Sequence, residues 1–355
     1  MEDVNGKHST DFSAVRAFRH FGFSRRRAGG HSFCRRATRE SREITPANIV
    51  VDLNRATSND RLRSRRDAHS KTGCEDRQPC FPSEMAEEQR PVVSSHKYRS
   101  FRLAGKVAVV SGGTSGIGLA VAERLGHEGA RLVVSSRKRA NVDRAVGELL
   151  DSGLRPEDVV GCVCHVGRAA DRRALVECAV RAFGRIDVLF HNAGVNPAMG
   201  DILEVSGGML DKLVDTNVSS AFFLTQLAVP HMPRGAAVVF NSTVAAFFPT
   251  RGILAYGAVK AALLSLTAAL SRELAPRGVR VNCLAPATTR TRMAGVLYRA
   301  DHEKHAVVHS ERVWLLPRIA EPEEVAGAAA YLASDDSSFV SGETHLIVGG
   351  IHCRL

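Results

Sequence analysis

A glycine-rich turn that joins a short apolar run to a helical pattern constrains the fold of this chain more than any other feature. Residues 106–111 (KVAVVS) are mostly apolar, as in a buried parallel strand, and the turn GGTSGIG follows at 112–118. Apolar residues then recur with a helical period. Glycines in such a turn let the backbone approach a pyrophosphate, and the helix N-terminus offers free N–H groups and the positive end of its dipole. A tight turn without a ligand is the alternative on this stretch alone.

Short apolar runs alternate with longer amphipathic stretches through the chain. The expected strands lie at 106–111, 131–136, 159–163, 186–190, 237–243, 279–283 and 344–348. This alternation predicts an α/β fold, a single Rossmann-type, doubly wound parallel seven-stranded sheet with helices on both faces, over residues 103–355. Because ligands of such sheets bind outside the carboxyl ends of the strands, we expect one crevice lined by the loops at 112–118, 136–138, 164–166 and 191–195.

The end of the second expected strand indicates which dinucleotide the chain prefers. An acidic residue there would hold the ribose 2′-hydroxyl of NAD, but the sequence is Ser135-Ser136-Arg137-Lys138. Two cations and two hydroxyls suit a 2′-phosphate, so NADPH is favoured. The alternative is that Arg137 and Lys138 only solvate the start of the next helix.

Tyr256 and Lys260 stand four residues apart at the start of a long apolar helical pattern, so their side chains share one helical face. An unperturbed tyrosine has a pKa of about 10, and a neighbouring ammonium lowers that pKa by favouring the phenolate. The pair therefore predicts a phenol that exchanges a proton near neutral pH. Because Tyr-x-x-x-Lys also occurs on solvated helices, a surface pair is the alternative on this motif alone.

Several polar positions would complete such a site. Ser242 and Thr243 place hydroxyls at the end of the fifth expected strand. Asn217 lies in an otherwise apolar helical stretch, where it either faces solvent or marks a bend that frees a backbone carbonyl to hold a water beside the ammonium. The loop at 286–291 carries hydroxyls that could reach a nicotinamide carboxamide. Residues 292–318 lack periodicity, and we expect a flexible lid there.

The first 99 residues differ in composition from the rest. The net charge of +11 is concentrated there in arginine clusters without apolar periodicity, so we expect a disordered basic extension. A mitochondrial transit peptide is an alternative, although Glu2 and Asp3 are unusual at its start. A nucleic-acid-binding arm is disfavoured because aromatic residues do not interleave with the basic ones. Met85, just before the expected domain, is a candidate start of translation.

The remaining composition limits the location and the cofactors of the chain. The eight cysteines show no paired C-x-x-C spacing and no signal peptide precedes them, so we expect a reducing compartment and no metal site. No apolar run reaches the eighteen or more residues of a membrane span, so none is expected.

The motifs together carry a family resemblance over about 250 residues, from Leu103 to the C-terminus. The sequence resembles the classical short-chain dehydrogenase/reductases in Ser111–Gly118, Asn192–Gly194, Asn217, Tyr256-x-x-x-Lys260 and Val281-Asn282. A closer resemblance, to the member 4 subgroup of peroxisomal carbonyl and retinal reductases, rests on Ser135–Lys138, Asn141–Asp143, Cys164–Gly167, Val195–Pro197, Glu273–Pro276 and Gly342–Thr344.

The resemblance implies an enzyme that reduces lipophilic or aromatic ketones and aldehydes, retinal included, with NADPH. Tyr256 would give the proton to the carbonyl oxygen, Lys260 would hold the nicotinamide ribose, and Asn217 would support a proton-relay water. A hydroxyl at 242 or 243 would bind the substrate oxygen. The cofactor would be held by Gly112, Thr114, Ser115, Gly116, Ile117, Gly118, Ser136, Arg137, Lys138, His165, Val166, Asn192, Ala193, Gly194, Tyr256, Lys260, Pro286 and Thr291.

Four positions depart from the family pattern. The substrate-binding serine of the family aligns with Thr243, whose extra methyl would crowd the carbonyl. His191 replaces an asparagine, and His165 stands where an aspartate often meets the adenine. Ala287 replaces the glycine of a Pro-Gly turn and would be strained if that position has a positive φ.

The C-terminal residues Cys353-Arg354-Leu355 fit the small–basic–leucine form of the peroxisomal signal, so we expect a peroxisomal enzyme recognised by the import receptor, and otherwise a cytoplasmic one. The family also implies a homotetramer. The alternatives are an NAD-linked alcohol or steroid dehydrogenase, an acyl ketoreductase, or a nucleotide-binding relative with impaired catalysis.

Overall fold

The computed structural model describes residues 100–295, 315–316 and 318–350. Its strands are β1 (Val107–Ser111), β2 (Arg131–Ser136), β3 (Val159–Val163), β4 (Val188–His191), β5 (Ala237–Asn241), β6 (Arg280–Pro286) and β7 (Thr344–Ile347). They form one seven-stranded sheet in the order β3-β2-β1-β4-β5-β6-β7, and every neighbouring pair is parallel. The predicted Rossmann-type α/β fold is therefore confirmed.

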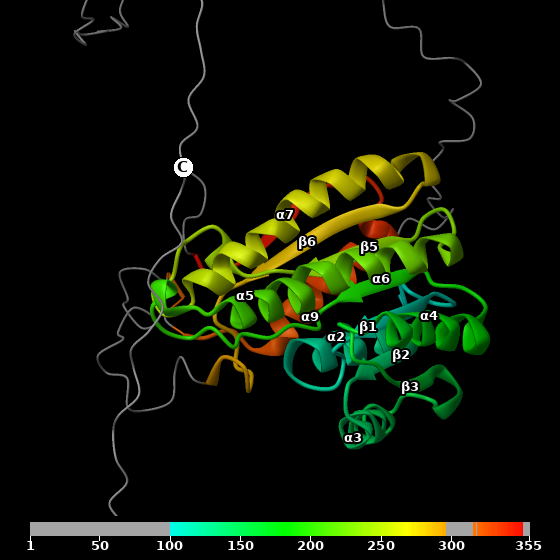
Figure 1. Ribbon diagram of the computed structural model, residues 1–355. Coiled ribbons are helices and arrows are strands. Elements are labelled where there is room, and N and C mark those ends of the chain that lie inside the picture. Colours follow the sequence, from blue (N-terminus) through cyan, green and yellow to red (C-terminus); the bar gives the residue numbers. More distant parts are fainter. Residues whose placement is uncertain (1–99, 296–314, 317, 351–355) are drawn as a thin grey trace, which may run out of the picture. The chain divides into compact units, whose positions relative to one another are not determined.

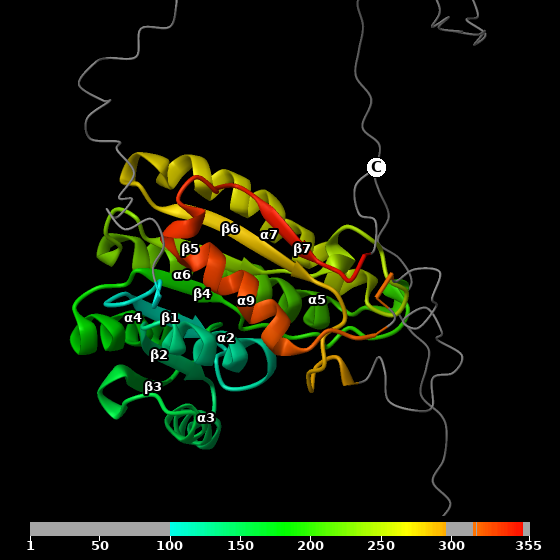
Figure 2. The same ribbon diagram turned by 180° about the vertical axis from the view of Figure 1, so that it is seen from behind.

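Helices cover both faces of this sheet. The longer ones are α2 (Gly116–His127), α3 (Arg139–Asp151), α4 (Ala169–Phe183), α5 (Gly207–Val214), α6 (Ser220–Ala228), α7 (Leu254–Leu274) and α9 (Pro322–Ala333). Figure 1 shows α4, α6 and α7 in front of the sheet, and Figure 2 shows α2 and α9 in front from the opposite side. Each layer has its own apolar core, one built with α2 and α9 and the other with α4, α6 and α7.

The central strands are apolar because they are covered on both sides. β1, β5 and β6 are buried at every residue, which explains why β1 and β5 are almost continuously apolar instead of alternating between apolar and polar residues. Since all strands run the same way, their carboxyl ends meet at one edge of the sheet, and the segments that follow them lie together there.

The apolar helical stretch that contains Asn217 is not one continuous α-helix. α5 ends at Val214, five residues from Asp215 to Ser219 form a π-helical turn, and α6 begins at Ser220. A π turn inserts one residue into the helical ladder and often marks a functional position. Asn217 lies in this turn, as the interpretation of a bend requires.

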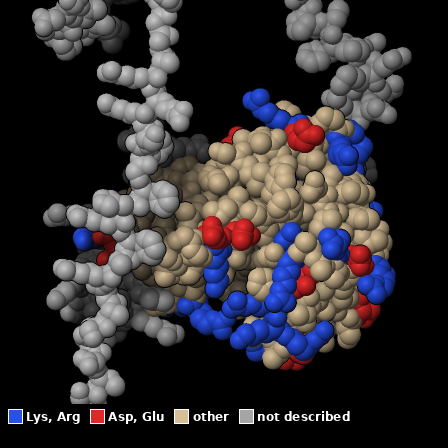
Figure 3. All heavy atoms as spheres, in the orientation of Figure 1, with Lys and Arg blue, Asp and Glu red and all other residues tan. Residues whose placement is uncertain are grey.

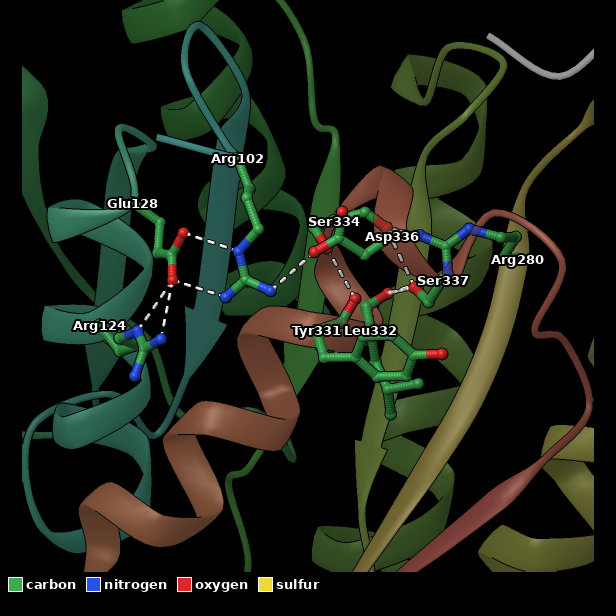
Figure 4. A network of polar contacts seen from close by, with 9 residues as sticks. All are labelled: Arg102, Arg124, Glu128, Arg280, Tyr331, Leu332, Ser334, Asp336 and Ser337. Atoms are coloured by element: carbon green, nitrogen blue, oxygen red, sulfur yellow. Dashed lines mark hydrogen bonds and ion pairs between the residues drawn. The ribbon is translucent and has the colours of Figure 1, made fainter. Parts of the chain in front are cut away.

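A polar network ties the amino-terminal ends of the central strands to α9 (Figure 4). The guanidinium of Arg280, on β6, is buried and donates to Leu332 O, Ser334 O and Ser337 Oγ, at 2.9, 3.0 and 2.7 Å. These carbonyls lie at the C-terminal end of α9, where the helix dipole favours a cation. Arg102 joins Glu128 to Asp336 in the same region, so this edge of the sheet is structural.

Several expectations fall outside the described residues. These are the disordered extension at 1–99 with Met85, most of the lid at 296–314, and the C-terminal signal at 353–355. The segment Leu254–Arg277, which contains α7, is long and apolar enough by length and composition to cross a membrane. In the structure α7 packs beside β6 as part of the core (Figure 1).

Candidate active site

A cavity of about 1210 Å³ lies at the carboxyl ends of the strands. The predicted site residues that line it are Gly112, Thr114, Ser115, Gly116, Ile117, Ser136, Arg137, Lys138, His165, Val166, Asn192, Ala193, Gly194, Ser242, Thr243, Tyr256, Lys260, Pro286 and Thr291. The other two, Gly118 and Asn217, pack against lining residues. The volume exceeds that of a typical drug-sized pocket, and a dinucleotide together with a small substrate needs such space.

The glycine turn packs tightly against the loop that follows β4. Gly112 has a φ of +66°, and a Cβ added there would lie 2.8 Å from the Cα of Ala193. α2 begins at Gly116, and the side chain of Ser115 makes no capping hydrogen bond, so the first N–H groups of the helix are free of a side-chain cap. This arrangement fits a pyrophosphate at the start of α2.

Positive charge lies at the same end of the cavity. Arg137 and Lys138 follow β2, are exposed, and pair with no carboxylate in the part of the chain that the structure describes. In Figure 3, Lys and Arg side chains gather beside a hollow on the part of the surface where α3 lies in Figure 1. The site therefore attracts anionic ligands.

Tyr256, Lys260 and Thr243 also line the cavity. Lys260 is buried, and its Nζ lies 5.8 Å from the ring centroid of Tyr256 and donates to Asn241 O at 2.7 Å. The hydroxyl of Ser242 is already used, because its Oγ donates to the backbone oxygen of Lys260 at 3.0 Å. Thr243 Oγ1 accepts from Ala245 N at 3.3 Å, so its proton stays available for a ligand. The structure thus distinguishes the two candidate hydroxyls, because Ser242 Oγ donates to the backbone whereas Thr243 Oγ1 accepts from it.

The expectation that Lys260 lowers the pKa of Tyr256 is wrong for the structure as it stands. Burial raises the pKa of Tyr256, and the ammonium is held by a backbone carbonyl instead of by the phenol oxygen. Burial also lowers the pKa of Lys260 to about 8. Near neutral pH the phenol is therefore protonated, which is the form that a proton donor needs.

Asn217 orients the loop after β4 from behind the cavity. Its Oδ1 accepts from Val195 N at 3.2 Å, and its Nδ2 donates to Val195 O and Leu213 O at 3.0 and 2.8 Å. A Cβ on Gly194 would lie 2.7 Å from Asn217 Oδ1, so glycine is required at 194. The proton-relay water that the bend was expected to hold stays a prediction.

Two departures from the family pattern are accommodated by the fold. The only residue other than glycine with a positive φ among the described ones is Phe101, so Ala287 does not carry the strain considered above. His165 lines the cavity, its backbone N–H donates to Asp171 Oδ2 at 2.9 Å, and its ring Nδ1 accepts from Gly167 N at 3.2 Å.

Three further residues, which the sequence did not identify as site residues, support the site. Ser111 Oγ accepts from Asn192 N and Ala193 N at 3.2 and 3.4 Å. Arg144 of α3 donates to Thr114 O at 2.7 Å and so holds the glycine turn. Asn241 lines the cavity at the end of β5. A polar residue at the carboxyl end of a buried strand was the signal that could have identified Asn241.

His191 is a buried neutral imidazole beside the site. Its Nε2 shares a hydrogen bond of 2.8 Å with Thr225 Oγ1, and its ring stacks on Phe240 with centroids 4.9 Å apart. Burial, with a smaller contribution from the charge of Lys260, lowers the pKa of His191 to about 3. The folded chain therefore resists protonation at this position.

Acid should destabilise the protein through His191. Below a pH of about 6.5 the imidazole of His191 is protonated in the unfolded chain and stays neutral in the folded chain. The free energy of unfolding therefore falls as the pH drops from about 6.5 toward 3. The slope approaches roughly 1.4 kcal/mol per pH unit, and the whole change would be about 5 kcal/mol. Urea unfolding at several pH values should show a steeper fall of the unfolding free energy in the wild type than in His191→Asn. Parallel stability curves for the two proteins would contradict the assignment.

Comparisons with known proteins agree with this geometry. The model of the family described as Enoyl-(Acyl carrier protein) reductase matches residues 112–352. The chain belongs to the short-chain dehydrogenase/reductases. It is 44% identical over 266 residues to human dehydrogenase/reductase SDR family member 4, covering 74% of this chain and 94% of that one. It is therefore an oxidoreductase of the type that uses a nicotinamide cofactor.

Plant and bacterial members of the same family are also similar to this chain. Identity is 44% to short-chain dehydrogenase/reductase SDRA of Arabidopsis thaliana, covering 72% of this chain and 97% of the relative. Identity to tropinone reductase-like 3 of Erythroxylum coca is 42%, covering 74% and 99%. A solved dehydrogenase/reductase from Sinorhizobium meliloti superposes with a TM-score of 0.65 at 31% identity, covering 71% of this chain and 97% of that structure.

Proposed function

We propose that this oxidoreductase reduces ketones and aldehydes to alcohols with NADPH. The observation that carries the proposal is one cavity lined by the glycine turn, by two free cations and by Tyr256, Lys260 and Thr243. When bound, the dinucleotide would supply hydride to the carbonyl carbon. Its pyrophosphate would lie on the turn at the start of α2, where the free N–H groups are.

The residues of the chain would handle the proton and the oxygen. The phenol of Tyr256, kept protonated by burial, would donate its proton to the carbonyl oxygen. The Thr243 hydroxyl would donate a hydrogen bond to the same oxygen as negative charge develops there. Lys260, held by Asn241 O, would hold the nicotinamide ribose through its ammonium. Asn217 would act from behind by fixing the loop at 194–195.

The preference for NADPH rests on the end of β2. Arg137→Ala combined with Lys138→Ala should raise the KM for NADPH about tenfold or more, because charge-assisted hydrogen bonds to the 2′-phosphate are lost. The KM for NADH, which lacks that phosphate, should change little. Steady-state kinetics with both cofactors measure the difference. Equal effects on both would contradict the role of this pair, and Arg181→Ala on α4, outside the cavity lining, is the matched control.

The substrate class is proposed to be lipophilic or aromatic carbonyls, retinal included. The cavity beyond the catalytic residues has apolar lining from Pro197, Met199, Val244, Ile253 and Met293, which supports this class. The relative from Erythroxylum coca is named tropinone reductase-like 3.

A carbonyl panel assayed with NADPH and with NADH tests the proposal. Faster turnover of aromatic ketones and aldehydes with NADPH is the expected result. Preference for NADH would favour an NAD-linked alcohol or steroid dehydrogenase, and preference for acyl-chain substrates would favour a ketoreductase. Cofactor binding without any turnover would favour the catalytically impaired alternative.

Thr243 should tune the size of the accepted substrate. Thr243→Ser keeps the hydroxyl donor and removes a methyl group that faces the carbonyl, so kcat/KM for bulky aryl ketones should rise about tenfold. A small aldehyde should react at nearly the wild-type rate and serves as the control. Steady-state kinetics with both substrates measure the change, and an identical factor for the two would refute the crowding argument.

We also propose a homotetramer and a peroxisomal location. The exposed apolar side chains Met209, Leu210, Val214, Phe222 and Phe223 on α5 and α6 support an assembly across these helices. The location rests on Cys353-Arg354-Leu355, which lies outside the described residues.

A further inference from the structure

We propose that Asn241 is a positioning residue whose side chain fixes the glycine turn for the dinucleotide by acting through Asn192. The inference rests on the proposed function, since it concerns how the same cavity binds its cofactor. Asn241 is the last residue of β5, is 7% exposed and lines the cavity.

The first step is that the turn rests on Asn192. Asn192 Nδ2 donates to Gly112 O at 2.9 Å. A Cβ on Gly118 would lie 2.4 Å from this nitrogen and 2.4 Å from Gly112 O. The Asn192 amide therefore fills the space between the first glycine of the turn and the first turn of α2. The position of this amide therefore determines how close the glycine turn lies to the first turn of α2.

The second step is that Asn241 orients this amide. A backbone carbonyl only accepts, so Gly112 O requires the nitrogen of the Asn192 amide on its side. Asn192 Oδ1 then accepts from Asn241 Nδ2 at 2.9 Å. The chain of donors runs one way, from Asn241 to the turn, and exchanging N and O in either amide would break it.

The third step is that the fold alone does not explain an amide at this position. Asn241 Oδ1 is buried and has no hydrogen-bond partner among the described residues. A buried unpaired amide oxygen destabilises a protein, and an apolar side chain of similar size would avoid this penalty. What the amide provides is the bond from its nitrogen to Asn192.

The fourth step separates two roles of the same residue. The backbone oxygen of Asn241 accepts from Lys260 Nζ at 2.7 Å, and that bond remains when only the side chain is changed. A side-chain substitution should therefore weaken cofactor binding without disturbing Lys260. The expected signature is a change in the binding constant for NADPH with kcat preserved.

Asn241→Val in the full chain tests the proposal. The dissociation constant of NADPH, measured by its fluorescence, should rise about five- to tenfold, as for the loss of one buried hydrogen bond. With saturating NADPH, kcat should stay within about twofold. Wild-type binding of NADPH, or a fall in kcat as large as the loss of binding, would overturn the proposal.

A double mutant shows whether Asn241 acts through Asn192. In Asn192→Ala, adding Asn241→Val should change the NADPH dissociation constant no further. Equal effects of Asn241→Val in both backgrounds would overturn the proposal. Asn241→Asp, nearly isosteric, should weaken binding at least as much because it faces Asn192 Oδ1 with an oxygen. If the wild type bound neither NADPH nor NADH, the proposed function would fail before this inference was reached.

Discussion

Replacing Tyr256 with Phe is expected to lower kcat by about 10²- to 10⁴-fold, the usual contribution of a positioned general acid. The phenol lies in the cavity beside Thr243 and Lys260, and burial keeps it protonated. Phe retains the ring and its packing, so the NADPH dissociation constant and the unfolding midpoint should change little. Steady-state turnover of a reactive diketone measures the loss.

The matched control for this variant is Tyr331→Phe. Tyr331 lies on α9, on the opposite face of the sheet, and is not a lining residue of the cavity. The control should turn over like the wild type. Residual activity near the wild-type level in Tyr256→Phe would reject the enzyme mechanism and leave the impaired, nucleotide-binding alternative.

Gly257→Ala should lower kcat by about 10²-fold although the residue touches no substrate. A Cβ at Gly257 would lie 2.5 Å from the backbone oxygen of Ala245, closer than real contacts allow, so α7 must move away from the turn at Val244–Ala246. Tyr256 lies on one of these segments and Thr243 precedes the other. A shift of about 1 Å between catalytic groups can reduce the rate by this factor.

Gly147→Ala is the control for the effect of alanine in a helix. Gly147 lies in α3, and a Cβ there meets no atom within 4 Å. This variant should gain about 0.5–1 kcal/mol of stability from helix propensity and keep wild-type kcat. Kinetics and thermal unfolding of both variants give the comparison. An unchanged kcat in Gly257→Ala would show that the contact between α7 and Ala245 does not set the position of Tyr256.

The structure also changes how the proton donor is understood. Sequence spacing placed an ammonium one helical turn from a phenol and suggested that the pKa of Tyr256 falls. In the folded chain the Lys260 ammonium is held by Asn241 O, and burial has the larger effect on the phenol. A raised pKa keeps the phenol protonated near neutral pH, and it also makes the phenol a weaker acid.

The sequence by itself determined the sheet, its parallel strands and most of the cavity lining. Apolar runs and glycines act locally, and parallel strands must end at one edge, so residues as far apart as Gly112 and Thr291 could be assigned to one crevice. The family resemblance then supplied roles for Tyr256 and Lys260.

Only the tertiary structure decided which groups bond to one another there. Thr243 Oγ1 accepts from Ala245 N, whereas Ser242 Oγ donates to Lys260 O, although the two residues are adjacent in sequence. The tertiary structure also joined Asn241 to Asn192, 49 residues away, and broke one expected helix at Asp215–Ser219. Hydrogen-bond direction and desolvation depend on neighbours distant in the chain, and local patterns carry no information about them.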